Sequence, residues 1–159
     1  MKYNRFEELP VWQDAIELAV RIYALTARPA FKGYYSLKDQ LERAGVSVSN
    51  NIAEGFERGT TQETLTFLYI SKGSAGETRS VLCLTDRLQR FRDLRSEISD
   101  LKARAESISR QLRGWCESLQ NTDIRGHRYL SDKTRRVAQQ AREREEFLKE
   151  LEESRKRGK

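Results

Sequence analysis

Proline, cysteine and histidine are scarce in this chain, and each shortage excludes a class of fold or site. Only two prolines occur in 159 residues, so long uninterrupted helices are possible. Cys83 and Cys116 are isolated, and the single histidine is His127, so the spacing of a zinc site is absent. No Glu-x-x-His pair occurs, which excludes the ligand pattern of di-iron helical bundles. We therefore expect no metal site.

Catalytic and cofactor motifs are missing as well. His127 lies in a segment without periodicity, which favours a solvated loop residue over a member of a catalytic triad. Residues 55–61 contain two glycines but lack the Gly-Lys-Ser/Thr ending of a phosphate-binding loop. We expect a protein that is not an enzyme and holds no cofactor.

Long apolar runs are also absent. No run approaches the roughly 18 residues that cross a bilayer. The first eight residues carry acids where a signal peptide needs an apolar core. Two thiols that we expect to be buried, within apolar helical patterns, fit a reducing compartment. These features predict a cytoplasmic protein with no membrane partner.

Charge is abundant, at 34% of residues against 37% apolar, and 30 basic residues exceed 24 acidic ones to give a net charge of +6. This composition favours long helices over sheets. Its positive sign is compatible with a nucleic-acid partner or an acidic protein surface, although many soluble proteins with no such partner share it.

Hydrophobic periodicity divides the first 122 residues into four amphipathic helices. The first begins at Pro10 and ends before Pro29, and the second runs from about Ser36 to Arg58. Thr60 and Glu63 have the spacing of a capping box that starts the third helix, and the fourth starts near Ser96 after a break within residues 92–96. The fold class predicted is all-α, an antiparallel up-and-down four-helix bundle over residues 1–122. Residues 123–159 form a linker and a charged C-terminal helical extension, which is more typical of a solvated tail than of a binding arm.

The third and fourth helices each carry a heptad pattern. The fourth places Ile98, Leu101, Ala105, Ile108, Leu112, Trp115 and Leu119 on one stripe. The pattern of the third helix predicts an inward seam that crosses Gly73 and Gly76, where small residues would admit a close neighbour. The members of that seam are Phe67, Ile70, Ser74, Glu77, Val81, Leu84, Leu88 and Phe91.

A polar seam follows from this phase, since Ser74 and Glu77 would face inward beside Asn51 of the second helix, with Glu54 on a flank. A buried carboxylate requires a partner or a raised pKa. A hydrogen-bonded network that fixes helix register or subunit pairing is the favoured interpretation. A ligand pocket, or an enzyme that uses Glu54 or Glu77, is the weaker alternative.

Arginines gather on the later part of the third helix, on the turn after it and on the fourth helix. Arginine forks suit phosphate oxygens, so these residues are candidates for nucleic-acid binding. Acids are interleaved with them, and such a face is more often a salt-bridged, solvated one. The candidates are Arg79, Arg87, Arg90, Arg92, Arg95, Arg104, Arg110 and Arg113.

Several motifs, in one order, carry a family resemblance. They are residues 9–15 (LPVWQDA), 40–44 (QLERA), 47–55 (SVSNNIAEG), 67–77 (FLYISKGSAGE) and 111–112 (QL). With them the chain resembles the bacterial four-helix bundle proteins encoded in intervening sequences of 23S ribosomal RNA genes, also labelled S23 ribosomal proteins. That family is distantly similar to the accessory variability protein of diversity-generating retroelements.

The resemblance implies an antiparallel bundle that assembles into a homopentamer. It also implies a function that involves RNA or DNA. Our first hypothesis is a non-enzymatic oligomeric bundle that binds nucleic acid through basic surfaces. The alternative is a protein-interaction scaffold or accessory subunit, with a polypeptide partner such as a reverse transcriptase.

Overall fold

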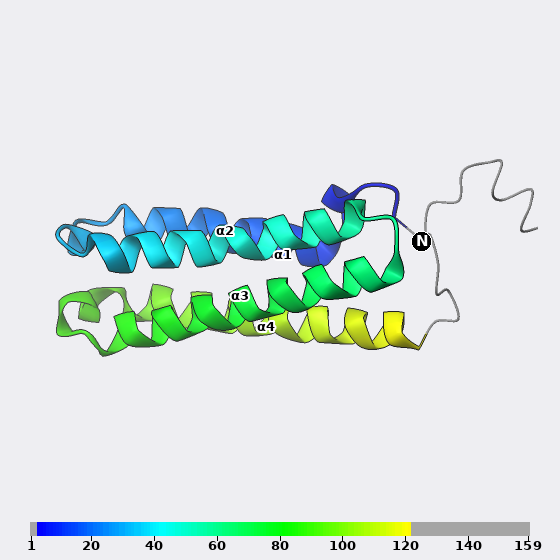
Figure 1. Cartoon of the computed structure of the whole chain (residues 1–159). Helices are drawn as coiled ribbons and strands as arrows, with labels where there is room; N and C mark the ends of the chain where they lie inside the picture. The colour runs from blue at the N-terminus through cyan, green and yellow to red at the C-terminus, as the bar shows by residue number, and fades with distance from the viewer. Residues whose placement is uncertain (1–2, 122–159) are drawn as a thin grey trace, which may run out of the picture. The chain divides into compact units, whose positions relative to one another are not determined.

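The computed structural model describes residues 3–121, and four long helices account for most of them (Figure 1). The expected all-α four-helix bundle is confirmed, whereas the tail predicted for residues 123–159 lies outside the described residues. None of the described helices combines the length and the hydropathy of a membrane span. In chain order the elements are η1 (Phe6–Glu8), α1 (Pro10–Thr26), η2 (Pro29–Phe31), α2 (Tyr35–Glu57), α3 (Thr61–Arg87), η3 (Gln89–Leu94) and α4 (Arg95–Gln120).

The helix ends follow the sequence signals closely at some points and not at others. The capping box is confirmed, since the Glu63 amide donates to Thr60 Oγ1 at 3.2 Å and the same hydroxyl donates to the Glu63 carboxylate at 2.7 Å. The second helix starts at Tyr35 without a side-chain cap from Ser36. The third ends at Arg87, earlier than expected, because the 3-10 turn η3 fills residues 89–94.

The two links α1–α2 and α3–α4 meet at one end of the bundle (Figure 1). Phe91 of η3 packs against Phe31 of η2, with ring centroids 4.6 Å apart, and edge-on against Tyr34 at 5.3 Å. Gly33 holds a φ of 89°, a conformation that other residues rarely adopt, and so lets the chain turn from η2 into α2.

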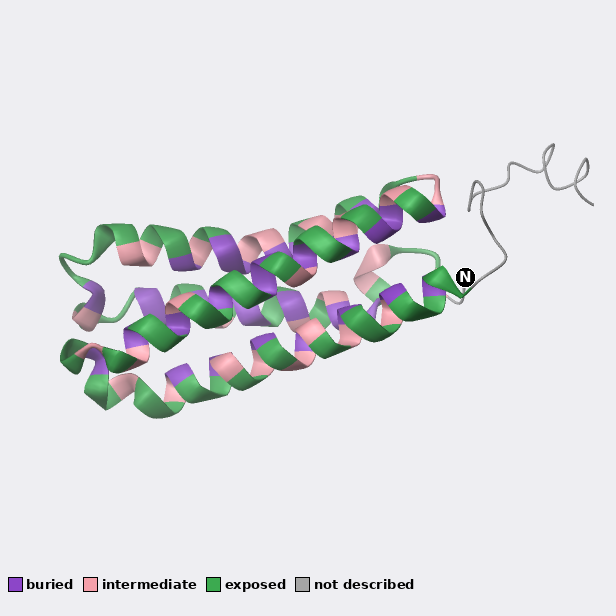
Figure 2. Ribbon diagram, turned by 60° about the horizontal axis from the view of Figure 1, so that its bottom comes forward, coloured by how far each residue is buried: buried purple, intermediate pink, exposed green. Residues whose placement is uncertain are grey.

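The core runs the length of the bundle, where buried residues line the inner faces of the helices (Figure 2). The stripe predicted for α4 is confirmed, except that Trp115 is only half-buried. In α1, Val11, Leu18 and Leu25 are buried at steps of seven residues, whereas Ile16 and Tyr23 are exposed. Each fully buried Leu, Ile or Phe contributes about 1.5–3 kcal/mol through its removal from water.

The inward seam predicted for α3 is only partly correct: Ser74 and Phe91 are buried, and Phe67, Val81 and Leu88 are half-buried, but three members are exposed. Ile70 and Leu84 are 46% and 53% exposed, and Glu77 is exposed as well. Instead, the buried row contains small and hydroxyl side chains alongside two leucines. The central members of that row are Thr64, Leu68, Ser71, Ala75, Thr78, Leu82 and Thr85.

Threonines can occupy this row because each hydroxyl is satisfied within its own helix. Thr64, Thr78 and Thr85 each donate to the carbonyl oxygen four residues earlier, at 2.9 Å in all three cases. With the polar atom satisfied, the rest of the side chain packs as a small apolar group. Hydrophobic periodicity ranked these residues below Ile70 and Leu84 and therefore selected the wrong face.

Small side chains on both partners let α2 and α3 approach closely. Ser71 Oγ, which is fully buried, crosses the contact to donate to the Val48 carbonyl of α2 at 2.8 Å. A methyl group added at Gly55 of α2 would lie 2.9 Å from Phe67 Cβ and 3.3 Å from the Thr64 carbonyl oxygen. Since Thr64 O is backbone, the neighbouring helix would have to move.

We therefore expect Gly55→Ala to lower the free energy of unfolding by about 1–3 kcal/mol, the usual cost of overpacking. Gly114→Ala is the matched control, because an added Cβ there meets nothing within 4 Å. It should instead raise stability by about 0.5–1 kcal/mol through helix propensity. Urea unfolding followed by circular dichroism measures both; equal effects at the two sites would contradict the close α2–α3 contact.

Candidate nucleic-acid interface

Most of the arginines that the sequence nominates are paired with carboxylates, so they form salt-bridged helix faces. Exposed pairs of this kind contribute little to stability but neutralise the positive charge around them. The pairs are Arg79–Glu106 at 3.8 Å, Arg92–Asp93 at 3.5 Å, Arg95–Asp86 at 3.8 Å, Arg104–Asp14 at 3.1 Å, Arg110–Glu106 at 3.4 Å and Arg113–Glu117 at 2.8 Å.

Only four cations of residues 3–121 have no carboxylate within 4.0 Å in that part of the chain: Lys32, Lys72, Arg87 and Arg90. Three of them lie at the end where the two links meet. Lys32 directly follows η2, Arg87 ends α3, and Arg90 lies in η3. We call this surface, with Arg92 and Tyr35, the basic end.

Contacts between the two links hold the basic end together. Arg90 Nε donates to the Ala30 carbonyl oxygen at 3.2 Å, which ties η3 to η2 beside the Phe31–Phe91 ring contact. Arg90 Nη2 also donates to the Pro29 carbonyl oxygen at 3.5 Å. These two bonds use only part of the guanidinium, which has five donors, so further N–H groups remain for an anion. Residues about 60 positions apart in the sequence thus form one surface.

The acids near the basic end are already engaged. Lys102 Nζ donates to Asp86 at 2.7 Å and holds the pKa of that carboxyl below its ordinary value, helped by the charges of Arg95 and Arg87. Glu97 forms an ion pair with Arg28 at 3.6 Å. Within the described residues, the carboxylates without a cationic partner lie elsewhere: they are Glu8, Glu17, Glu57 and Glu77. Positive charge is therefore least compensated at this end.

Sequence reasoning found Arg87, Arg90 and Arg92 of this surface and missed Lys32 and Tyr35. Tyr35 is 74% exposed at the first position of α2. The signal was present in the segment Lys32-Gly33-Tyr34-Tyr35, which is basic and aromatic and joins two helices. In an up-and-down bundle that link lies beside the link between the third and fourth helices.

The polar seam forms around serines and amides, without buried carboxylates. Ser47 and Ser74 hydroxyls lie 2.9 Å apart across the α2–α3 contact, and half-buried Asn51 donates to the Ser47 hydroxyl at 3.0 Å. The prediction that Glu77 faces inward is wrong, since this exposed carboxylate accepts a hydrogen bond from the Gln40 amide at the surface. Exposed Glu54 pairs with Arg58 at 2.6 Å.

Two shallow grooves flank this seam, of about 290 Å³ beside α3 and about 400 Å³ beside α1. They share Arg43 and Ser47. The carboxylates that line them are already engaged: exposed Glu77 accepts from Gln40, exposed Glu54 pairs with Arg58, and half-buried Glu42 pairs with Lys38 at 3.7 Å.

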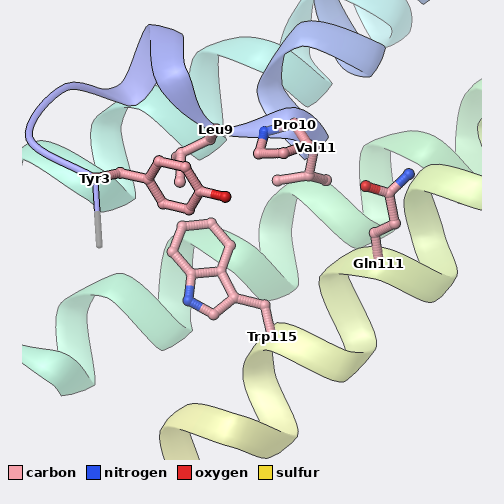
Figure 3. Close-up of a pocket in the computed structure, with 6 residues that line it drawn as sticks. All are labelled: Tyr3, Leu9, Pro10, Val11, Gln111 and Trp115. Carbon is pink, nitrogen blue, oxygen red and sulfur yellow. The ribbon is translucent and has the colours of Figure 1, made fainter. Parts of the chain in front are cut away.

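A third hollow, of about 260 Å³, lies between the start of α1 and the end of α4, away from the basic end. Its walls are mostly apolar, and the rings of Tyr3 and Trp115 face each other in it (Figure 3). The Gln111 amide that reaches its edge already donates to Asp14 at 2.8 Å. The lining of the hollow contains no charged side chain.

Metal-binding and thiol chemistry find no site in the part of the chain that the structure describes. No group of three or more His, Cys, Asp or Glu side chains there could hold a metal ion. Burial raises the pKa of the Cys116 thiol, which makes it less reactive. The expectation that both thiols are buried is wrong for Cys83, which is exposed on α3. His127 lies outside the described residues.

Comparison with known proteins agrees with this picture of a helical bundle. The family profile described as "23S rRNA-intervening sequence protein" matches residues 7–114. The chain belongs to this family. No curated protein sequence matches it.

A solved structure is also similar to the bundle. It is a protein of unknown function from the S23 ribosomal protein family of Bacteroides thetaiotaomicron VPI-5482, with a TM-score of 0.60. The alignment has 23% sequence identity and covers 67% of this chain and 98% of that one. At this identity the likeness supports the fold alone. Neither comparison bears on the distant similarity to retroelement accessory proteins, which stays a prediction.

The exposed position of Glu77 has a direct consequence for stability. We expect Glu77→Gln to change the free energy of unfolding of the monomer by no more than about 0.5 kcal/mol, as surface substitutions do. Ser71→Leu, at a buried site on the same helix, should cost about 1–3 kcal/mol by overpacking the α2–α3 contact. Urea titration of both variants tests this. A strongly destabilised Glu77→Gln monomer would contradict the exposed position of this carboxylate.

Proposed function

We propose that this chain is a non-enzymatic helical protein that binds nucleic acid, RNA or DNA, through its basic end. The observation that carries the proposal is the segregation of charge. Three of the four cations without a carboxylate partner in residues 3–121 lie together, while carboxylates without a cation lie elsewhere. Membership in a family named for intervening sequences of 23S rRNA genes supports RNA association.

Phosphate contacts account for the expected affinity. Lys32 and Arg87 need break no ion pair to meet a phosphate oxygen, whereas Arg110 and Arg113 would have to leave Glu106 and Glu117. Each phosphate that a cation neutralises releases condensed counterions, so binding weakens as salt rises. The remaining candidate arginines stay predicted contacts of lower rank.

The test is a salt series of RNA and DNA binding by fluorescence anisotropy. We expect Lys32→Ala and Arg87→Ala each to weaken binding alike on all sequences and to reduce the slope of log K against log salt by about 1. Arg113→Ala removes an arginine that is already paired and serves as the matched control. Binding that barely changes with salt, or equal losses in all three variants, would contradict a role for the basic end.

A second candidate function, a self-associating scaffold, is favoured by two exposed helix faces with almost no charge. The first, which we call the α1 outer face, carries no charged residue, and its Val20 is 58% exposed. It consists of Gln13, Ile16, Val20, Tyr23 and Ala27. The α3 outer face carries only Glu77. It consists of Thr66, Ile70, Gly73, Glu77, Ser80 and Leu84.

Both outer faces repeat at alternating steps of three and four residues, which is the spacing of helix–helix packing. A Cβ at Gly73 or at the adjacent Gly76 would meet nothing within 4 Å, so the fold of one chain does not require glycine there. Each glycine costs about 1 kcal/mol of helix propensity relative to alanine. Close approach of α1 from a second copy explains both glycines. The number of subunits, five by resemblance, and a partner such as a reverse transcriptase stay predictions.

Mass in solution tests this scaffold. We expect Val20→Asp and Leu84→Asp to shift light-scattering mass towards the monomer, because each buries a new charge in an apolar contact. Ser118→Asp adds the same charge to an exposed position of α4 and should leave the mass unchanged. Identical masses for all three variants and the parent chain would exclude these faces as the contact.

A further inference from the structure

Tyr35 is the one aromatic side chain at the basic end that the fold does not use. It is 74% exposed and has no ring contact or hydrogen bond among the described residues. Its neighbour Tyr34 contrasts with it, since that ring packs edge-on against Phe91 at 5.3 Å. A large apolar ring left in water at a helix start gains nothing from the bundle, so its use lies in an interaction with another molecule.

The surroundings of Tyr35 restrict what that molecule can be. Lys32 lies three residues earlier in the same turn, and the interlinked turns bring Arg87 and Arg90 to the same end. A free ring beside cations without carboxylate partners is the combination that single-stranded nucleic acid requires, because unpaired bases stack on aromatic rings while phosphates meet lysine and arginine.

We infer that the basic end takes single-stranded rather than duplex nucleic acid, with one base stacked on Tyr35 and the flanking phosphates on Lys32, Arg87 and Arg90. This inference rests on the proposed function and narrows its ligand class. In a duplex the base faces are covered by their neighbours, so Tyr35 could not stack on an internal base, and this surface would meet only phosphates, sugars and groove edges. Three cations at the tip of a bundle reach few phosphates, which makes the stacked base a major part of the affinity.

Stacking and charge can be separated by substitution at a single residue. Tyr35→Phe keeps the ring, Tyr35→Leu keeps apolar bulk without a ring face, and Tyr35→Ala removes both. The position is exposed at the first turn of α2, so all three variants should unfold at the same temperature as the parent chain.

The experiment measures anisotropy of labelled RNA and DNA strands of about ten nucleotides, and of the matching duplexes, across a salt series. We expect the single strands to bind at least tenfold more tightly than the duplexes. Tyr35→Ala and Tyr35→Leu should each lose about tenfold in single-strand affinity with an unchanged salt slope, and Tyr35→Phe should retain it. Comparison of the RNA and DNA arms shows which sugar the site accepts.

Each contrary result has a distinct meaning. Duplex bound as tightly as single strand, or full affinity in Tyr35→Ala, overturns the stacking inference. If Lys32→Ala and Arg87→Ala still weaken binding in that case, the proposed function stands without it. If no strand binds the parent chain at any salt, both the inference and the proposed function fail.

Discussion

The close contact between α2 and α3 is the constraint on which the rest of the structure depends. Gly55 leaves no room for a Cβ against Thr64 and Phe67, and Ser71 reaches across to the Val48 carbonyl. Only small side chains allow this separation, so α3 must turn its row of serine, threonine and alanine towards α2 and the core. The rotation of α3 about its axis follows from this one contact.

That rotation decides what α3 shows to water. Ile70 and Leu84 become surface residues, together with Gly73 and Gly76, where an added Cβ would meet no atom of residues 3–121 within 4 Å. The charged residues of the chain are instead concentrated on other faces, where arginines and acids pair with one another. Within residues 3–121, three of the four cations without a carboxylate partner lie at the end where the two links meet. The proposed self-association and nucleic-acid binding would therefore use separate parts of the same bundle.

Sequence reasoning succeeded where one physical signal acted alone. The stripe of α4 is plainly apolar, and the Thr60–Glu63 box sets the start of α3 by local geometry. It failed on α3, because threonine hydroxyls that bond to their own helix are as easily buried as apolar groups. A hydrophobicity pattern does not show that a threonine hydroxyl is already hydrogen-bonded within its own helix.

The candidate surfaces could be predicted only in part for a related reason. Whether an arginine is free depends on acids that the fold brings near it, such as Asp14 for Arg104, 90 residues away. Lys32 and Tyr35 join Arg87 only through contacts between two links, Phe31 with Phe91 and Arg90 with Ala30. Such pairings require the bundle connectivity and cannot be read from local spacing.

Thiol protection along α3 tests its rotation most directly. In a chain whose Cys83 and Cys116 are replaced by serine and alanine, single cysteines are placed at position 71 or position 70 and exposed to a thiol reagent at a concentration where the protein is a monomer. The account predicts that Ser71→Cys stays protected until the bundle unfolds, whereas Ile70→Cys reacts at once. Rapid reaction of Ser71→Cys with protection of Ile70→Cys would contradict it.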